Sequence, residues 1–220
     1  AVIQSSSATT VMVVGFVNAG MMTLNQAVWI IMGANIGTTV TGLLIALDVG
    51  ELAPLIAFAG VVLAVFVKRP QLQHIGQILA GLGVLFIGMD MMSAAMAPLR
   101  ESEAFISIMS NFSNPLLGIL AGAVFTAIIQ SSSASVGILQ ALANSGVIAY
   151  ANSVFVLFGQ NIGTCITAVL ASIGTNRNAK RTTIIHLMFN LIGTLIFTCL
   201  FLVFPIASVV DGSLVLPGAA

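Results

Sequence analysis

The chain has 220 residues, of which 59% are hydrophobic and 5% are charged, and its mean hydropathy is +1.15. Globular domains contain about 25% charged residues, so this composition excludes a soluble protein and predicts an integral membrane protein. The formal net charge is zero, which leaves no electrostatic basis for binding nucleic acid. The two cysteines, Cys165 and Cys199, fall in apolar segments, so we expect no disulfide framework.

The first half of the chain contains one moderately apolar segment, residues 5–22, followed by three apolar segments. These are residues 27–47, 52–67 and 74–98, and we count each as one membrane pass although the second is a little short. Asp90 lies inside the last of them. An ionisable residue within a membrane span is a functional hypothesis by default, although Asp90 can equally reach the membrane interface.

The segment 115–149 is the most informative part of the second half. As one helix it would be about 52 Å long, too long for roughly 30 Å of hydrocarbon, whereas two full passes would have only about 17 residues each. Three serines at its midpoint cannot face lipid unsatisfied. We therefore predict a re-entrant hairpin of two half-helices with residues 130–133 at its tip. Residues 152–173 and 183–206 then form two further spans, and residues 207–220 a loose tail.

Two polar motifs occur twice, in the same order and at the same spacing. Gln4–Ser7 returns as Gln130–Ser133, and Gly33–Thr39 returns as Gly159–Cys165. The 38 residues that begin at Gln4 align without a gap with those that begin at Gln130, and 14 of these positions are identical. The identities are nearly all polar residues or glycine. This pattern indicates a duplicated site and not only a duplicated scaffold.

The duplication divides the chain into a first inverted repeat with its connecting spans, residues 1–114, and a second inverted repeat, residues 115–206. We expect each repeat to contain a re-entrant hairpin and a transmembrane helix broken at its Asn-Ile-Gly-Thr motif. Three passes separate the hairpins, so the hairpins enter from opposite faces, as in many secondary transporters. Residues 115–130 lead into the second hairpin tip, and we therefore expect a corresponding helix upstream of Ala1.

Basic residues support this topology. If each hairpin returns to its starting side, loops 68–73 and 174–182 share one side of the membrane. That side carries five basic residues: Lys68, Arg69, Arg177, Lys180 and Arg181. The other side carries only Arg100. Because short cytoplasmic loops are enriched in Lys and Arg, we predict a multi-pass protein of the cell membrane with both basic loops in the cytoplasm.

We expect the four motifs to meet near the middle of the bilayer. A helix broken there exposes N–H groups at one end and carbonyl groups at the other, which can bind an anion and cations side by side. Glycines at positions 33, 37, 159 and 163 would allow the unwound backbone. Hydroxyls can serve either kind of ion, and neutral amide oxygens suit weakly held sodium. The motifs contain no Lys or Arg, so a bound oxyanion would depend on co-bound cations.

These motifs resemble those of a known family, the type II sodium-dependent phosphate cotransporters in their bacterial form. The similarity rests on Gln4–Ser7 with Gly33–Thr38, on Gln130–Ser133 with Gln160–Thr164, and on the basic loop that leads into His186–Asn190. It extends over essentially the whole chain. It implies an all-α membrane protein that takes up inorganic phosphate with sodium as the coupling ion and without any other cofactor.

The resemblance also implies roles for individual residues. Serines of both hairpin tips would bind phosphate, namely Ser5, Ser6, Ser7, Ser131, Ser132 and Ser133. Amide and hydroxyl side chains would bind sodium, namely Gln4, Asn35, Thr38, Thr39, Gln130, Asn161 and Thr164. The chain departs from the family pattern at Cys165, where a threonine would supply a further hydroxyl ligand.

The function predicted from the sequence is therefore a symporter that works by alternating access in the lipid bilayer. The alternatives are a sodium-coupled carboxylate or sulfate carrier and a membrane phosphate sensor that does not transport. An enzyme is disfavoured because the apolar segments hold no carboxylate pair, Ser/His/Asp set or metal cluster. His186 and Asn190 lie four residues apart and suit a bond between helices or a part in transport. Homo-oligomerisation and a regulatory domain or subunit outside this chain are left open.

Overall fold

The computed structural model of this chain describes residues 2–3, 5–47, 52–96, 98 and 114–204, and these ranges are helical with no strand. Four helices are long and apolar enough to cross a membrane: Leu24–Ala46, Pro70–Met92, Tyr150–Ala171 and Arg177–Val203. The prediction of an all-α integral membrane protein is confirmed. The predicted site residue Gln4, the predicted tail 207–220 and most of the link between the repeats lie outside the described residues.

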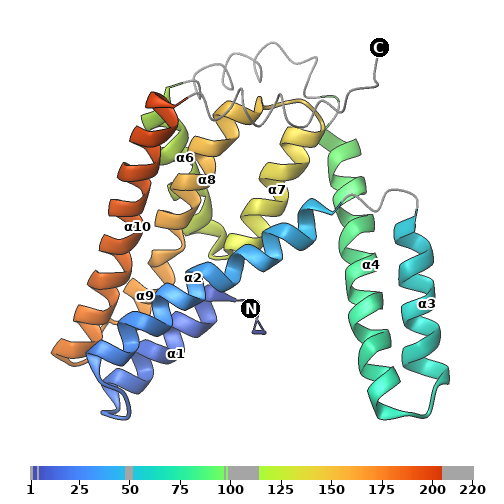
Figure 1. The fold of residues 1–220 in the computed structure, drawn as a ribbon, viewed down its shortest axis with the longest axis horizontal. Coiled ribbons are helices and arrows are strands. Elements are labelled where there is room, and N and C mark those ends of the chain that lie inside the picture. Colours follow the sequence, from blue (N-terminus) through green and yellow to red (C-terminus); the bar gives the residue numbers. More distant parts are fainter. Residues whose placement is uncertain (1, 4, 48–51, 97, 99–113, 205–220) are drawn as a thin grey trace.

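Figure 1 shows how the helices are arranged. The first half forms α1 (Ser6–Asn18), α2 (Leu24–Ala46), α3 (Ala53–Phe66) and α4 (Pro70–Met96). The second half forms α6 (Pro115–Ile129), α7 (Ser132–Asn144), α8 (Tyr150–Gly163), α9 (Cys165–Ala171) and α10 (Arg177–Val203). Helices α3 and α4 pack as a pair beside the other helices, and the end of α2 reaches this pair (Figure 1).

The segment 115–149 is broken where its sequence predicts. Helix α6 ends at Gln130, which has a left-handed backbone with φ 59°, and α7 begins at Ser132. Ser131 between them caps α7 by accepting a hydrogen bond from a backbone N–H at 3.3 Å. A left-handed residue followed by a serine cap stops one helix and starts the next within two residues. That this pair of helices is re-entrant in a membrane stays a prediction.

The repeats share their local structure around α1 and α7. Ser5 caps α1 as Ser131 caps α7, with hydrogen bonds of 3.1 and 3.3 Å to a backbone N–H three residues on. Both helices have 13 residues, and a glycine with positive φ follows each, Gly20 at 73° and Gly146 at 66°. In Figure 1 α1 and α7 begin near the middle of the molecule and run toward opposite ends. The inverted topology of the repeats in the membrane stays a prediction.

The predicted helix break in the first repeat is wrong, because α2 runs without interruption through Gly33–Thr39. Glycine costs a helix only about 1 kcal/mol, which tertiary packing can offset. Thr38 and Thr39 also donate their hydroxyls to carbonyls of the same helix, at 3.1 and 2.6 Å, so their side chains need no unwound backbone. In the second repeat the interruption is a single residue, Thr164, between α8 and α9.

The glycines of α8 serve helix packing and not an unwound backbone. A Cβ on Gly159 would collide with the carbonyl oxygen of Ile119, and one on Gly163 would collide with that of Ala123. Helices α6 and α8 are thus in backbone contact, as small residues permit in membrane proteins. Gly33 is equivalent to Gly159, yet a Cβ there would meet no described atom within 4 Å.

Candidate functional site

A cavity of about 450 Å³ lies between the two repeats, where α1 and α2 approach α7 and α8. Eight of its lining residues are site residues predicted from the sequence: Ser6, Asn35, Thr38, Thr39, Ser132, Ser133, Asn161 and Thr164. The others are Thr41, Gly42, Leu43, Val136 and Leu157. The structure therefore gathers hydroxyl and amide side chains from all four motifs around one space.

Two helices present their N-terminal ends to this cavity. Ser6 is the first residue of α1, and Ser132 and Ser133 are the first two residues of α7. The first N–H groups of a helix have no partner within it, and the helix dipole places about half a positive charge there. None of the described residues that line the cavity is charged. Its positive potential therefore comes from backbone and hydroxyl groups.

Four buried polar atoms without a partner lie on the two repeats, and one of them, Asn35 Nδ2, belongs to a residue that lines the cavity. Ser7 Oγ and Asn35 Nδ2 are buried on the first repeat, and Thr126 Oγ1 and Gln160 Oε1 are buried on the second, and none has a hydrogen-bond partner among the described residues. An unsatisfied buried polar atom costs about 1–3 kcal/mol, so such atoms are rare unless a water or ligand binds them. At the cavity this applies to Asn35 Nδ2, which is free to bind a water or a ligand there.

The other predicted site residues lie beside the cavity. Ser5 lines a second, smaller space of about 290 Å³ between α1 and α2, which shares Ser6 and Thr38 with the main cavity. Ser131 is occupied as the cap of α7, and Gln130 is exposed at the end of α6. Neither they nor Ser7 are among the residues that line the main cavity.

Gln160, which the sequence reasoning did not include among the site residues, connects two helices of the candidate site without lining the cavity. It is 1% exposed, and its Nε2 donates to the Ser135 carbonyl at 3.0 Å, which joins α8 to α7 below the serine tip. The first repeat has Ala34 at the equivalent position, so a comparison of identical residues between the repeats does not indicate Gln160. A polar residue next to the Asn-Ile-Gly-Thr motif was the available signal.

Cys165, His186 and Asn190 form a buried polar contact between α9 and α10. Asn190 Nδ2 donates to the His186 carbonyl at 2.9 Å and lies 3.3 Å from Cys165 Sγ. His186 is fully buried, and neither ring nitrogen has a partner in the described part of the chain. None of the three lines the cavity. No group of three His, Cys, Asp or Glu side chains that could hold a metal occurs among the described residues.

These features define a helical membrane protein with an uncharged cavity between two sequence repeats, where hydroxyl and amide side chains lie among apolar ones. The chain belongs to the Na+/Pi-cotransporter family, whose model matches residues 1–94 and 98–207. The predicted resemblance is confirmed, and the family is one of transporters and not of enzymes. No solved structure matches the chain.

Relatives differ in how much of their length the chain matches. It is 36% identical over 87% of its length to the uncharacterized protein YqeW of Bacillus subtilis, and 31% identical over 96% of its length to the putative inorganic phosphate export protein YjbB of Salmonella typhimurium. It is also 31% identical over 56% of its length to the human sodium-dependent phosphate transport protein 2B. The chain spans 62%, 39% and 20% of these three proteins, respectively.

Proposed function

We propose that the chain forms the membrane part of a sodium-coupled symporter that imports inorganic phosphate. The observation that carries this proposal is the cavity of about 450 Å³ between the repeats, which is lined by hydroxyls and amides and by no charged residue that the structure describes. Membership of the Na+/Pi-cotransporter family supports phosphate and sodium as the ions.

Phosphate would bind at the starts of α1 and α7. Ser6, Ser132 and Ser133 line the cavity there and offer hydroxyl donors beside the free N–H groups of two helix ends. A helix N-terminus with serine hydroxyls is a general anion-binding arrangement. The remaining serines of the two tips would support this site from outside the cavity, through their backbone groups and the helix caps. These are Ser5, Ser7 and Ser131.

Sodium would bind along α2 and at the junction of α8 and α9. Asn35, Thr38 and Thr39 line the cavity on the first side, and Asn161 and Thr164 line it on the second. We include Gln130 and Gln4 in this set because they flank the serines. With no Lys or Arg at the cavity, an isolated phosphate would be strongly disfavoured in a low dielectric, and bound sodium would offset its charge. Phosphate binding should therefore require sodium.

Transport would follow alternating access between inverted repeats. In this scheme both hairpins and the helices that carry the Asn-Ile-Gly-Thr motifs move against a scaffold of the other spans. The protein would lie in the cell membrane with loops 68–73 and 174–182 in the cytoplasm. An inward sodium gradient then drives import. One relative is named a putative phosphate exporter and another a sodium-dependent transporter, so the direction needs a direct test.

Reconstitution into liposomes provides that test. Labelled phosphate should accumulate when sodium is imposed outside, and not when choline replaces sodium. Counterflow separates a carrier from a sensor, because only a carrier exchanges labelled for unlabelled phosphate. Competition by excess sulfate or a dicarboxylate identifies the alternative substrates. Accumulation that ignores sodium would reject the proposed coupling, and the absence of counterflow would favour a sensor.

A further inference from the structure

A second polar cavity, of about 420 Å³, lies between the ends of α2 and α7 and the side of α4. It is lined by Asp90, Gln140 and Asn144, by the last residues of α2 (Ile45, Ala46 and Leu47), and by Phe86 and Met89. It shares no lining residue with the cavity between the serine tips. The function proposed above assigns no role to these side chains.

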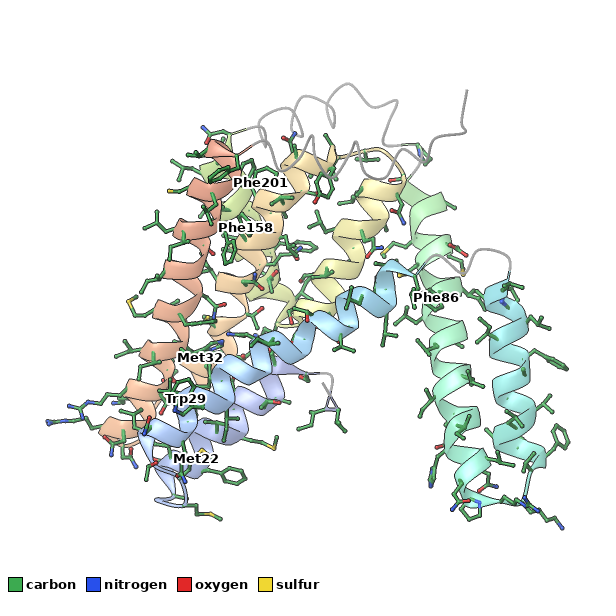
Figure 2. All side chains as sticks on the ribbon, viewed as in Figure 1. Met22, Trp29, Met32, Phe86, Phe158 and Phe201 are labelled. Carbon is green, nitrogen blue, oxygen red and sulfur yellow. The ribbon has the colours of Figure 1, made fainter. Side chains whose placement is uncertain are left out.

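Asp90 is the only acidic side chain in the described ranges of the chain, and no ion pair engages it there. It lies within the candidate span Pro70–Met92, near the end of that span. Phe86, one turn earlier, is 7% exposed and lies beside the end of α2 (Figure 2). Residues four apart share a helix face, so Asp90 lies on the same side of α4 and lines the cavity, and its side chain is exposed in the structure. A carboxylate in a membrane span without a cation is costly.

The other polar groups of this cavity add negative potential. Gln140 Nε2 donates to the Ile45 carbonyl at 3.3 Å, which leaves Gln140 Oε1 as an acceptor. Helix α2 ends at Ala46 and α7 ends at Asn144, so two helices direct their C-terminal ends here. The helix dipole places about half a negative charge at such an end, although N–H groups of the following turn bond the carbonyls of Ala141, Leu142 and Ala143 in α7. Helix α7 thus has its positive end at the serine cavity and its negative end at this one.

We propose that this cavity binds one sodium ion, held by Asp90 together with the oxygens of Gln140, Asn144 and the end of α2. Carboxylate, amide and carbonyl oxygens are ligands for hard cations. Asp90 is the one carboxylate in the described lining, and it balances one positive charge, which favours a monovalent ion. Among the basic residues that the structure describes, Lys68 and Arg69 are the nearest to Asp90 along the chain, and they precede the start of α4, about 30 Å away by helix rise. The preference for sodium also rests on the proposed sodium coupling, whereas cation binding itself does not.

An ion bound at the C-terminal end of α7 would influence the serine cavity at the N-terminal end of the same helix. It would join α4 to α7 and to the end of α2, and these two helices also carry Ser132 and Asn35 at the serine cavity. Sodium bound here would therefore fix the position of both helices on α4 before phosphate binds. The ion would act on phosphate through the placement of α2 and α7 and without touching the phosphate.

Sodium binding to the purified 220-residue chain, in phosphate-free buffer with choline as the balancing cation, tests the proposal. Binding of radioactive sodium should show a component that Asp90→Asn weakens at least tenfold and that Gln140→Leu weakens by a smaller factor. Met89→Leu, a change in the same cavity that removes no oxygen, should leave this component unchanged. A variant with both Ser6→Ala and Ser132→Ala should also retain it, although its phosphate binding is impaired.

The outcomes are distinct from those for phosphate transport. Sodium binding by Asp90→Asn that equals the unmodified chain overturns the site. Tighter binding of Ca²⁺ than of Na⁺ to the Asp90-dependent component overturns the choice of ion. Gln140→Leu keeps the test decisive if Asp90→Asn does not fold, because unchanged sodium binding in that variant contradicts the proposed ligand set. Loss of the proposed phosphate transport with retained Asp90-dependent sodium binding would reject the transport function and leave this site standing.

Discussion

Asn176, in the turn before α10, and Asn18, the last residue of α1, are joined by two hydrogen bonds although 158 residues separate them. The backbone N–H of Asn176 donates to Asn18 Oδ1 at 2.8 Å, and Asn176 Nδ2 donates to the Asn18 carbonyl at 2.9 Å. Asn176 Oδ1 also accepts from the N–H of Ala179 at 2.9 Å and so caps α10. One side chain therefore starts the last helix and attaches it to the first repeat.

Removal of this side chain should destabilise the fold measurably. Asn176→Ala loses a helix cap and a cross-repeat bond, which together amount to about 2 kcal/mol, whereas Asn18→Ala loses about 1 kcal/mol. Thermal unfolding in detergent should show a lower midpoint for both variants, with the larger decrease for Asn176→Ala. Asn178→Ala, two residues away and exposed, is the matched control. A midpoint for Asn176→Ala equal to that of the control would contradict this account of the turn.

Substitution of serines should distinguish the residues that bind the anion from the other residues around the cavity. Ser6→Ala or Ser132→Ala removes one charge-assisted hydrogen bond, which corresponds to about 1.5–3 kcal/mol, or roughly tenfold to a hundredfold in phosphate affinity at saturating sodium. Ser172→Ala removes a buried hydroxyl that bonds only within its own turn, so affinity should not change. Full sodium-driven phosphate transport by the Ser6→Ala, Ser132→Ala double variant would exclude the proposed anion site.

Equivalent glycines of the two repeats should respond differently to the same substitution. Gly159→Ala places a methyl group against the backbone of α6 and should lower stability by about 1–3 kcal/mol. Gly33→Ala meets open space in the described structure and should be neutral or raise stability by up to about 1 kcal/mol through helix propensity. The unfolding midpoints of the two variants provide the comparison. An equal decrease in stability for both variants would show that packing against α6 is not the cause of the decrease in Gly159→Ala.

Labelling of single cysteines tests the predicted topology. In a background without Cys165 and Cys199, cysteines at Gln71 and Asn178 should react with an impermeant reagent from the cytoplasmic side only. A cysteine at Ser102 should react from the outside only, because three passes separate the two hairpins. Reaction of positions 71 and 178 from opposite faces would require a topology without re-entrant hairpins.

The sequence predicted the start of α7 well because that start depends on local chemistry. Serine is a helix cap wherever its backbone is extended, so the Gln-Ser-Ser-Ser motif marks the start of a helix without knowledge of the rest of the fold. The continuity of α2 was not predictable in this way. The glycines at 33 and 37 permit unwinding but do not require it, and the hydroxyls of Thr38 and Thr39 bond within the helix.

Other parts of the site depend on contacts between distant segments. Gln160 matters because Ser135 lies beside it, and no pattern within either motif specifies that contact. Asp90 stood out as a charge in an apolar segment, yet its neighbours Gln140 and Asn144 come from the other repeat. Identities between the repeats could not reveal Gln160 and Gln140, whose counterparts are Ala34 and Val14, or Asp90, which lies outside the aligned segments.

The backbone contact of α6 with α8 would affect the speed of the transport cycle proposed above. Helices that touch through glycines cannot slide along each other unless they first separate by the width of a side chain, so the second hairpin and α8 should travel together. Rotation of this unit against the last helix is then concentrated in the turn around Gly174, between α9 and α10, which has positive φ. The residues that limit turnover would thus lie at the far ends of the helices from the residues that determine affinity.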